Sequence, residues 1–248
     1  MKCANCGHPI EFDRTTCRLC SEPVGYPNVR KAEAMRADLD HNFANAVADA
    51  ERRGVKPLVD KLEALLSLSV ATINLHPNVL LSMTLGTDYR SYYKALDAGL
   101  RTVAEEIYHR HRNVVDAAIH SGYYQEITYA AVSPDRRGLT SYGEITLQLG
   151  ERFIAHRATV LRENAFAFYE RYDLGRRDAR EAPGWRCVWS DRGHLGIAHL
   201  EIELTLAVSE AMLPNVILAV GVDKDHDKFM EGGHIRRCGD RDGRAGFS

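Results

Sequence analysis

Long apolar runs are missing from this chain of 248 residues. A membrane-spanning helix needs about eighteen consecutive apolar residues, and because no such stretch occurs we expect no contact with a membrane. The N-terminal residues Met1, Lys2 and Cys3 are not followed by the apolar segment of a signal peptide. We therefore expect a cytoplasmic protein. In that reducing compartment, paired cysteines indicate a metal site rather than disulfide bonds.

Two familiar nucleotide-binding motifs are missing as well. The sequence contains neither a glycine-rich dinucleotide fingerprint nor a phosphate-binding P-loop, and no internal repeat is visible. Its formal net charge is −2 at pH 7, so the chain lacks the overall positive charge that is typical of nucleic-acid-binding proteins. With 45% hydrophobic residues, the chain can form one large domain, or one medium domain with an appendage.

Four of the six cysteines stand near the N-terminus, in two Cys-x-x-Cys pairs. The pairs are Cys3 with Cys6 and Cys17 with Cys20, and Gly7 follows the first pair where a tight turn favours glycine. Two such pairs close a tetrahedral four-sulfur site that leaves no open position for catalysis. So short a segment cannot build a hydrophobic core. The sequence therefore predicts a zinc ribbon over residues 1–22, held together by one structural Zn²⁺.

The role of this ribbon is left open by its sequence. Zinc ribbons of this size bind nucleic acid or protein, or cap a domain, and here only Lys2, Arg14 and Arg18 supply positive charge. The other two cysteines, Cys187 and Cys238, stand alone, and we interpret them as free thiols without a nucleophilic role.

Helical patterns dominate the region from 30 to 121. Apolar residues every four positions predict a helix over 30–53 that Gly54 ends, and a leucine-rich stretch after Pro57 predicts a second helix. The short apolar run 70–75 predicts a strand that ends at His76. A further helix is expected over 88–121. Its expected buried stripe consists of Leu100, Val103, Ile107, Val114 and Ile119.

Strand patterns dominate the region after Gly122. They predict strands over 127–132, 142–149, 199–206 and 216–222, with one helix over 163–172 and a loop over 173–184. Helices first and strands later favour an α+β fold over a doubly wound sheet. The predicted organisation is a small N-terminal zinc ribbon, then an α+β domain over 30–236 with a helix-rich segment and a mostly antiparallel sheet. A disordered tail over 237–248 follows.

Three groups of residues carry the chemistry that the sequence suggests. His76 follows a strand, Ser141 and Tyr142 open another, and Glu201 and Glu203 share one face of a third. In this order they resemble the three elements of ADP-ribosyltransferase sites. Each residue also has a plainer interpretation, as a strand-end histidine, as turn residues, or as the solvated face of an edge strand.

The chemistry of that class explains these residue types. Breaking the bond between nicotinamide and ribose in NAD creates an oxocarbenium-like centre, which a nearby carboxylate stabilises. A neutral imidazole can hydrogen-bond the adenosine-side ribose, and a tyrosine ring can stack on nicotinamide. The second carboxylate can orient the attacking group.

The order of short motifs also resembles an uncharacterised bacterial and phage domain family. That family shows a strand with His-Pro, then Tyr-Arg-Ser, Gly-x-Tyr, Tyr-Gly-Ala-Leu, Tyr-Gly, Arg-x-Thr and x-Glu-x-Gln. The matching positions here are Leu75 to Asn78, Tyr89 to Ser91, Gly122 and Tyr123, Tyr129 to Val132, Ser141 to Gly143, Arg157 to Thr159, and His199 to Glu203. The resemblance covers about residues 70–230.

Two departures from the family pattern affect the interpretation. Ala130 replaces a glycine, and Glu203 replaces a glutamine, so Glu201 is the catalytic acid by the family pattern and Glu203 by the transferase pattern. Arg90 and Arg157 match family positions, and an arginine suits the pyrophosphate of a bound dinucleotide. Surface salt bridges are the plainer interpretation of both.

Together these observations predict an NAD-dependent ADP-ribosyltransferase or NAD glycohydrolase, with a toxin or phage-conflict role. The ribbon would recruit a protein or nucleic-acid target. The alternative is a non-enzymatic zinc-ribbon adaptor. A third reading, a metal-dependent hydrolase using His194, His199 and Glu203, is disfavoured because strand alternation would place the two histidines on opposite faces. The sequence does not indicate the oligomeric state.

Overall fold

The computed structural model describes residues 1–200 except 12, 85–89, 100–105 and 177–181. The predicted strands over 199–206 and 216–222, with Glu201 and Glu203, therefore lie outside the described residues, apart from His199 and Leu200. The predicted tail and Cys238 lie outside them too.

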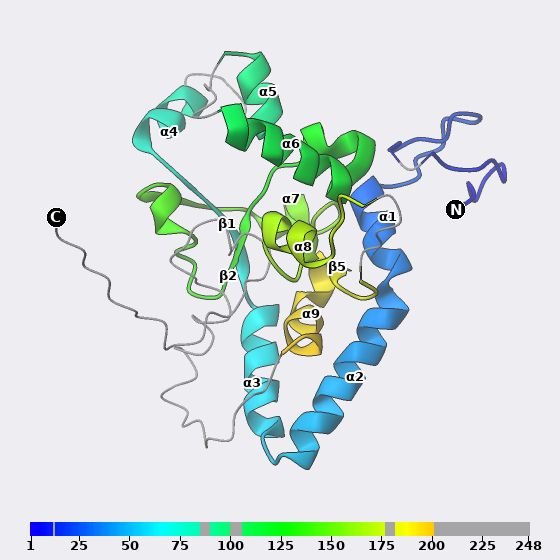
Figure 1. Cartoon of the computed structure of the whole chain (residues 1–248), viewed down its shortest axis with the longest axis vertical. Helices are drawn as coiled ribbons and strands as arrows, with labels where there is room; N and C mark the ends of the chain where they lie inside the picture. The colour runs from blue at the N-terminus through cyan, green and yellow to red at the C-terminus, as the bar shows by residue number, and fades with distance from the viewer. Residues whose placement is uncertain (12, 85–89, 100–105, 177–181, 201–248) are drawn as a thin grey trace.

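Helices α2 (Arg36–Arg52) and α3 (Lys56–Ser67) form the lower part of the molecule, and α1 (Pro27–Ala34) continues α2 upward along one side (Figure 1). Gly54 makes the turn between α2 and α3 with a φ of 69°. The predicted helix over 30–53 is thus two helices that meet at Met35. The expected leucine-rich second helix is α3.

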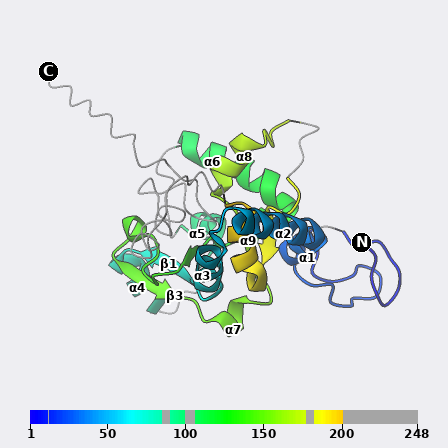
Figure 2. The ribbon, with the colours of Figure 1, turned by 90° about the horizontal axis from the view of Figure 1, so that it is seen from below.

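A helix that the sequence pattern did not indicate packs against this pair. Helix α9 (Arg192–Ala198) contacts both α2 and α3. Figure 2, seen from below, shows it between these two helices. At its start, a Cβ on Gly193 would come within 2.1 Å of Ser67 Oγ and 3.1 Å of the Glu63 carbonyl oxygen, so any larger residue would require Ser67 to move. Ala50, Val59, Leu62 and Ile197 are buried between these helices.

A three-stranded antiparallel sheet occupies the middle of the fold, in the order β2-β1-β3. The central strand β1 (Val70–Leu75) is where the sequence predicted it. It pairs Thr72 with Ala131 of β2 (Ala131–Ser133) and Leu75 with Ile145 of β3 (Ile145–Gln148). The strand expected over 127–132 thus begins later, and Tyr142 lies in a 3₁₀ helix, η2 (Thr140–Tyr142), before β3.

A second, two-stranded sheet pairs β4 (Thr159–Leu161) with β5 (Arg186–Val188), and α1 packs on it. Helix α7 (Glu151–Ile154) precedes β4, and the 3₁₀ helix η3 (Trp189–Asp191) follows β5. The predicted helix over 163–172 is α8 (Ala165–Arg171), whose N-cap Asn164 accepts a hydrogen bond from the Phe166 backbone. The strands β4 and β5 were not predicted.

The upper part of the molecule carries α4 (Pro77–Thr84), α5 (Tyr92–Asp97), α6 (Glu106–His120) and the 3₁₀ helix η1 (Ser121–Glu126) (Figure 1). The helix expected over 88–121 is therefore α5 and α6. Its expected buried stripe is wrong at Val114, which is 53% exposed, whereas Val115 is buried with Ile119 against α8. Ile119 is buried as expected, whereas Leu100, Val103 and the side chain of Ile107 lie outside the described residues.

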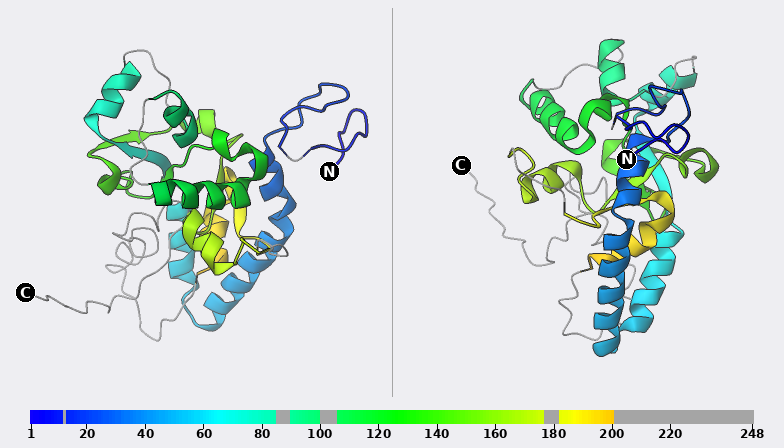
Figure 3. Two further views of the ribbon diagram at one scale, coloured as in Figure 1. Left: turned by 45° about the horizontal axis from the view of Figure 1, so that its top comes forward. Right: turned by 90° about the vertical axis from the view of Figure 1, so that its right-hand side faces the viewer.

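The α+β prediction is confirmed: helices surround a small antiparallel sheet, and a four-cysteine cluster lies near the N-terminus. In the described part of the chain, no helix combines the length and apolar character needed to cross a membrane. Figure 3 shows residues 1–22, called the ribbon below, standing out beyond the N-terminal end of α1.

Candidate functional site

The four N-terminal cysteines form a compact cluster. Their Sγ atoms all lie within 4.8 Å of one another, with 3.7 Å between Cys3 and Cys20 and 3.5 Å between Cys6 and Cys17. A disulfide needs about 2.05 Å. A tetrahedral ion with metal–sulfur bonds of about 2.3 Å separates its sulfurs by about 3.8 Å. The cluster therefore has the dimensions of a four-thiolate metal site.

The backbone forms the same hydrogen-bonded turn at each cysteine pair. The N–H of Gly7 donates to the carbonyl of Cys3, and the N–H of Ser21 donates to the carbonyl of Cys17, each at 2.9 Å. Gly7 and Ser21 both have positive φ, 70° and 59°. The sequence indicated the first turn through its glycine, whereas Ser21 gave no signal because serine rarely adopts this conformation.

A buried arginine of the body contacts the ribbon and the short segment that follows it. Arg30 of α1 is 7% exposed, and its guanidinium donates to the carbonyls of Val24 at 3.1 Å, Gly25 at 2.6 Å and Glu11 at 3.4 Å. The arginines on the ribbon surface are already engaged. Glu11 pairs with both Arg14 at 2.7 Å and Arg18 at 3.2 Å, and these contacts lower the pKa of its carboxyl.

A second group of predicted residues meets at the C-terminal end of β1. His76 follows β1 directly and is exposed, and its Nδ1 lies 3.3 Å from Glu144 Oε2. The backbone N–H of Glu144 and then His76 lower the pKa of the Glu144 carboxyl. Gly143, between Tyr142 and Glu144, lies against the strand end. A Cβ there would come within 2.1 Å of the carbonyl carbon of Leu75.

The side chain of Asn74 holds this group in place. Its Nδ2 donates to the carbonyls of Arg137 at 3.1 Å and Gly143 at 3.3 Å and to Thr146 Oγ1 at 2.9 Å. Its Oδ1 accepts from the Leu139 backbone at 2.6 Å. Asn74 thus ties the loop that carries Ser141 and Tyr142 to β1. Sequence reasoning missed it, although an asparagine within an apolar strand is a signal, because a polar group placed there needs partners.

The two predicted arginines are separated. Arg157 is exposed, and its backbone carbonyl accepts a hydrogen bond from Asn28 of α1 at 2.8 Å, so it belongs to the α1 side of the molecule. Arg90 instead lines an open pocket of about 590 Å³ together with Lys94 of α5 and with Glu126 and Thr128. Thr128 precedes β2. Because β2 runs antiparallel to β1, this segment extends toward the end of β1 where His76 lies.

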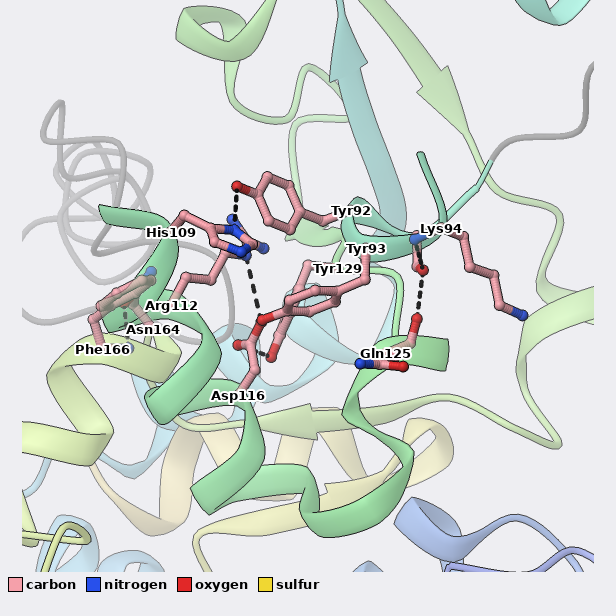
Figure 4. Close-up of polar contacts among 11 residues, drawn as sticks. Tyr92, Tyr93, Lys94, His109, Arg112, Asp116, Gln125, Tyr129, Asn164 and Phe166 are labelled. Carbon is pink, nitrogen blue, oxygen red and sulfur yellow. Dashed lines mark hydrogen bonds and ion pairs between the residues drawn. The ribbon is translucent and has the colours of Figure 1, made fainter. Parts of the chain in front are cut away.

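Beside the pocket, a buried carboxylate binds two tyrosines (Figure 4). Asp116 of α6 is 1% exposed and accepts from the hydroxyls of Tyr93 at 2.8 Å and Tyr129 at 2.7 Å. Arg112 lies 3.4 Å from the same carboxylate and over the ring of Tyr92, whose hydroxyl lies 3.2 Å from His109 Nδ1. Burial, and then Asp116, raise the pKa of Tyr93. His109 and Arg112 are both half-buried in this group.

The histidines of the hydrolase interpretation have structural partners. His194 lies on α9 rather than on a strand, stacks on Phe43 at 4.2 Å between ring centroids and lies 3.5 Å from Glu63. His199 Nε2 lies 2.9 Å from the carbonyl oxygen of Gly184, and burial lowers its pKa to about 4. The expectation that His194 and His199 lie on opposite faces of a strand is wrong, because His194 lies in α9 and His199 caps the end of that helix.

The predicted free thiol Cys187 is buried in the core, and burial raises its pKa, as expected for a cysteine without a nucleophilic role. Of the predicted site residues, the structure thus brings His76 together with the Ser141–Tyr142 loop and places Arg90 in a pocket. Arg157 lies elsewhere, and Glu201 and Glu203 lie outside the described residues.

Comparison with known proteins adds no relative. No family model matches the chain, and no significant match was found among curated proteins or solved structures. The function must therefore be argued from the residues themselves.

Proposed function

We propose that this protein is an NAD-dependent ADP-ribosyltransferase or NAD glycohydrolase whose site lies at the C-terminal end of β1. The observation that carries the proposal is the packing of Gly143 on Leu75, which brings the loop of Ser141 and Tyr142 to His76. These are two of the three elements of the proposed site, and they come from distant parts of the sequence.

Each described side chain is suited to its proposed task. The exposed imidazole of His76 can hydrogen-bond a ribose, and Glu144 holds its orientation at 3.3 Å. Tyr142 is 38% exposed, and stacking on nicotinamide is the task proposed for its ring. Glu201 or Glu203 supplies the carboxylate that stabilises the oxocarbenium-like centre, and the other orients the acceptor.

The metal of the ribbon is zinc in this proposal, and it has a structural role. Four thiolates from Cys3, Cys6, Cys17 and Cys20 are a donor set that zinc prefers, and they leave no coordination position for substrate. The ribbon then recruits the target of the transfer.

The experiment is nicotinamide release from NAD, with cell lysate added as acceptor in a parallel reaction. The wild-type protein should release nicotinamide, and the double variant Glu201→Ala, Glu203→Ala should lose at least about a hundredfold in rate. The double variant Glu51→Ala, Asp49→Ala on α2 is the matched control and should retain full activity. Equal rates for both double variants would contradict the proposal.

Single variants divide the roles. Whichever of Glu201→Gln and Glu203→Gln abolishes release identifies the catalytic carboxylate, and this result decides between the family and the transferase patterns. His76→Ala should raise KM more than it lowers kcat, because its proposed role is to bind the ribose.

A binding function without catalysis is the second candidate, favoured by the surface of the ribbon. Met1 and Leu19 are 71% and 67% exposed there, and in this candidate function they contact a protein partner. The ribbon carries few cations, Lys2, Arg14 and Arg18, and two of them pair with Glu11, so a protein partner fits this surface better than nucleic acid, which needs several phosphate contacts. Absence of nicotinamide release with every acceptor would favour this candidate.

A further inference from the structure

The pocket beside α5 is built from two walls. One wall is α5, which contributes Lys94 and Asp97, with the preceding Arg90. The other wall is the end of η1, which contributes Glu126, with the segment that follows it, which contributes Thr128. Its volume of about 590 Å³ lies within the roughly 300–1,000 Å³ typical of small-molecule sites.

Buried contacts fix the distance between these walls. Tyr93 of α5 and Tyr129 of the opposite wall donate to the same carboxylate, that of Asp116, at 2.8 and 2.7 Å (Figure 4). Ser91, the N-cap of α5, also donates to the carbonyl of Gln125. Because these bonds are shielded from water, the walls are held whether or not a ligand is bound.

One further contact between the walls is weak and exposed. Lys94 pairs with Glu126, and their side chains are 50% and 62% exposed. An exposed ion pair of this kind contributes little to stability, so a ligand anion can take the place of Glu126 on Lys94 at small cost. Within the described part of the chain, no carboxylate pairs with the guanidinium of Arg90. Arg90 is therefore a second cation available to the same ligand.

The remaining lining groups narrow the ligand further. Asp97 brings a negative charge, which would repel a bare phosphate but accepts hydrogen bonds from sugar hydroxyls. Thr128 is exposed and adds a hydroxyl. Two cations with a carboxylate and a hydroxyl suit a molecule that joins a phosphate to a sugar.

We propose that this pocket binds a ribosyl phosphate, the unit that the ADP-ribose part of NAD contains. Arg90 and Lys94 bind the phosphate, Asp97 accepts from the ribose hydroxyls, and Glu126 competes with the phosphate for Lys94. The identification of NAD as the source rests on the proposed function, whereas the binding of a ribosyl phosphate does not need turnover.

Calorimetric titration with ADP-ribose, and with adenosine as the phosphate-free probe, tests the pocket. ADP-ribose should bind the full-length protein and adenosine should bind much more weakly. Arg90→Ala should weaken ADP-ribose binding by about tenfold or more, since it removes a charge-assisted contact. Arg52→Ala on α2, another exposed arginine, should leave the affinity unchanged.

Glu126→Gln supplies the sharper test. The variant removes the carboxylate that competes with the phosphate for Lys94, so it should bind ADP-ribose several-fold more tightly than the wild-type protein. Glu51→Gln is its matched control. Three outcomes would overturn the inference: no binding of ADP-ribose at millimolar concentration, equal affinities of Arg90→Ala and Arg52→Ala, or weaker binding by Glu126→Gln. Binding that follows the expected pattern without any nicotinamide release would contradict the proposed function and leave the pocket assignment standing.

Discussion

The ribbon and the body of this protein are stabilised in different ways. Among the described residues of the ribbon, only Cys3 and Cys17 are buried, and its large apolar side chains Met1 and Leu19 face solvent. The body buries apolar clusters between α2, α3 and α9 and between α6 and α8. The cysteine cluster could hold a metal ion, and we infer that the ribbon depends on that metal for its fold, whereas the body depends on apolar burial.

This difference separates the two proposed tasks. A metal-held ribbon keeps its whole surface available to a partner, because none of it is needed for a core. The body can hold side chains in fixed positions, as Asn74 and Asp116 do, because their hydrogen bonds are supported by packed elements around them. Four changes test this comparison, and the one with the largest expected effect comes first.

Gly143→Ala should destabilise the body by about 3 kcal/mol. The added methyl group would lie 2.1 Å from the backbone of Leu75, and the φ of 153° disfavours any residue with a side chain. Thermal unfolding measures the effect. Gly99→Ala, also at positive φ but with open space around it, should cost only about 1 kcal/mol. Equal losses in the two variants would show that the contact between Gly143 and β1 is not tight.

Arg30→Ala should loosen the ribbon from the body while the metal stays bound. The variant leaves the carbonyls of Val24 and Gly25 without their donor, which costs about 1–3 kcal/mol. Hydrogen exchange should rise in residues 1–26 and stay unchanged in α2 and α3. Arg18→Ala, on the ribbon surface, is the control. The same exchange pattern in both variants would refute an anchoring role for Arg30.

Lowering the pH from 7 to 5.5 should destabilise the body. His120 is buried among Arg186, Lys31 and the rings of Tyr123 and Tyr129, and burial lowers its pKa well below the usual value. The unfolded chain then binds a proton near pH 6.5 that the folded chain does not, so stability falls below that pH. Each such histidine contributes a slope of up to about 1.4 kcal/mol per pH unit.

The substitution His120→Phe keeps an aromatic ring in the same place and should remove the contribution of His120 to the pH dependence of the free energy of unfolding. His199, with a pKa lowered to about 4, retains its own share of the slope in that variant. Denaturant unfolding at several pH values measures the change, with His41→Ala on α2 as the control. An unchanged slope in His120→Phe would contradict this account.

Glu11→Ala should have the smallest effect. It removes the partner of Arg14 and Arg18, but these pairs are exposed, and exposed pairs contribute little. The melting temperature should change by less than about 2 °C. A larger fall would mean that ribbon stability depends on surface charge as well as on the metal.

Residue patterns predicted the elements that depend on local rules. The cysteine pairs indicated the metal cluster because ligand spacing is local, and the apolar β-branched run 70–75 indicated β1 with its correct bounds. His76 at the end of β1 followed from that strand. These successes need no knowledge of long-range contacts.

The failures share a long-range cause. No element was predicted over residues 192–198, yet they form α9, whose Ile197 is buried against apolar residues of α2 and α3. Asp116 was not singled out within the predicted helix over 88–121, and it is buried because Tyr93 and Tyr129 approach it from other segments and donate to its carboxylate. Single-sequence patterns carry no information about such partners.

The central claim, that the ribbon needs a metal and the body does not, is tested most directly by hydrogen exchange before and after chelation, with the metal content measured in parallel. We predict one zinc ion per chain, and after its removal faster exchange in residues 1–22 with unchanged protection in α2, α3 and α9. A protein without bound metal, or a body that loses its protection together with the ribbon, would contradict the account.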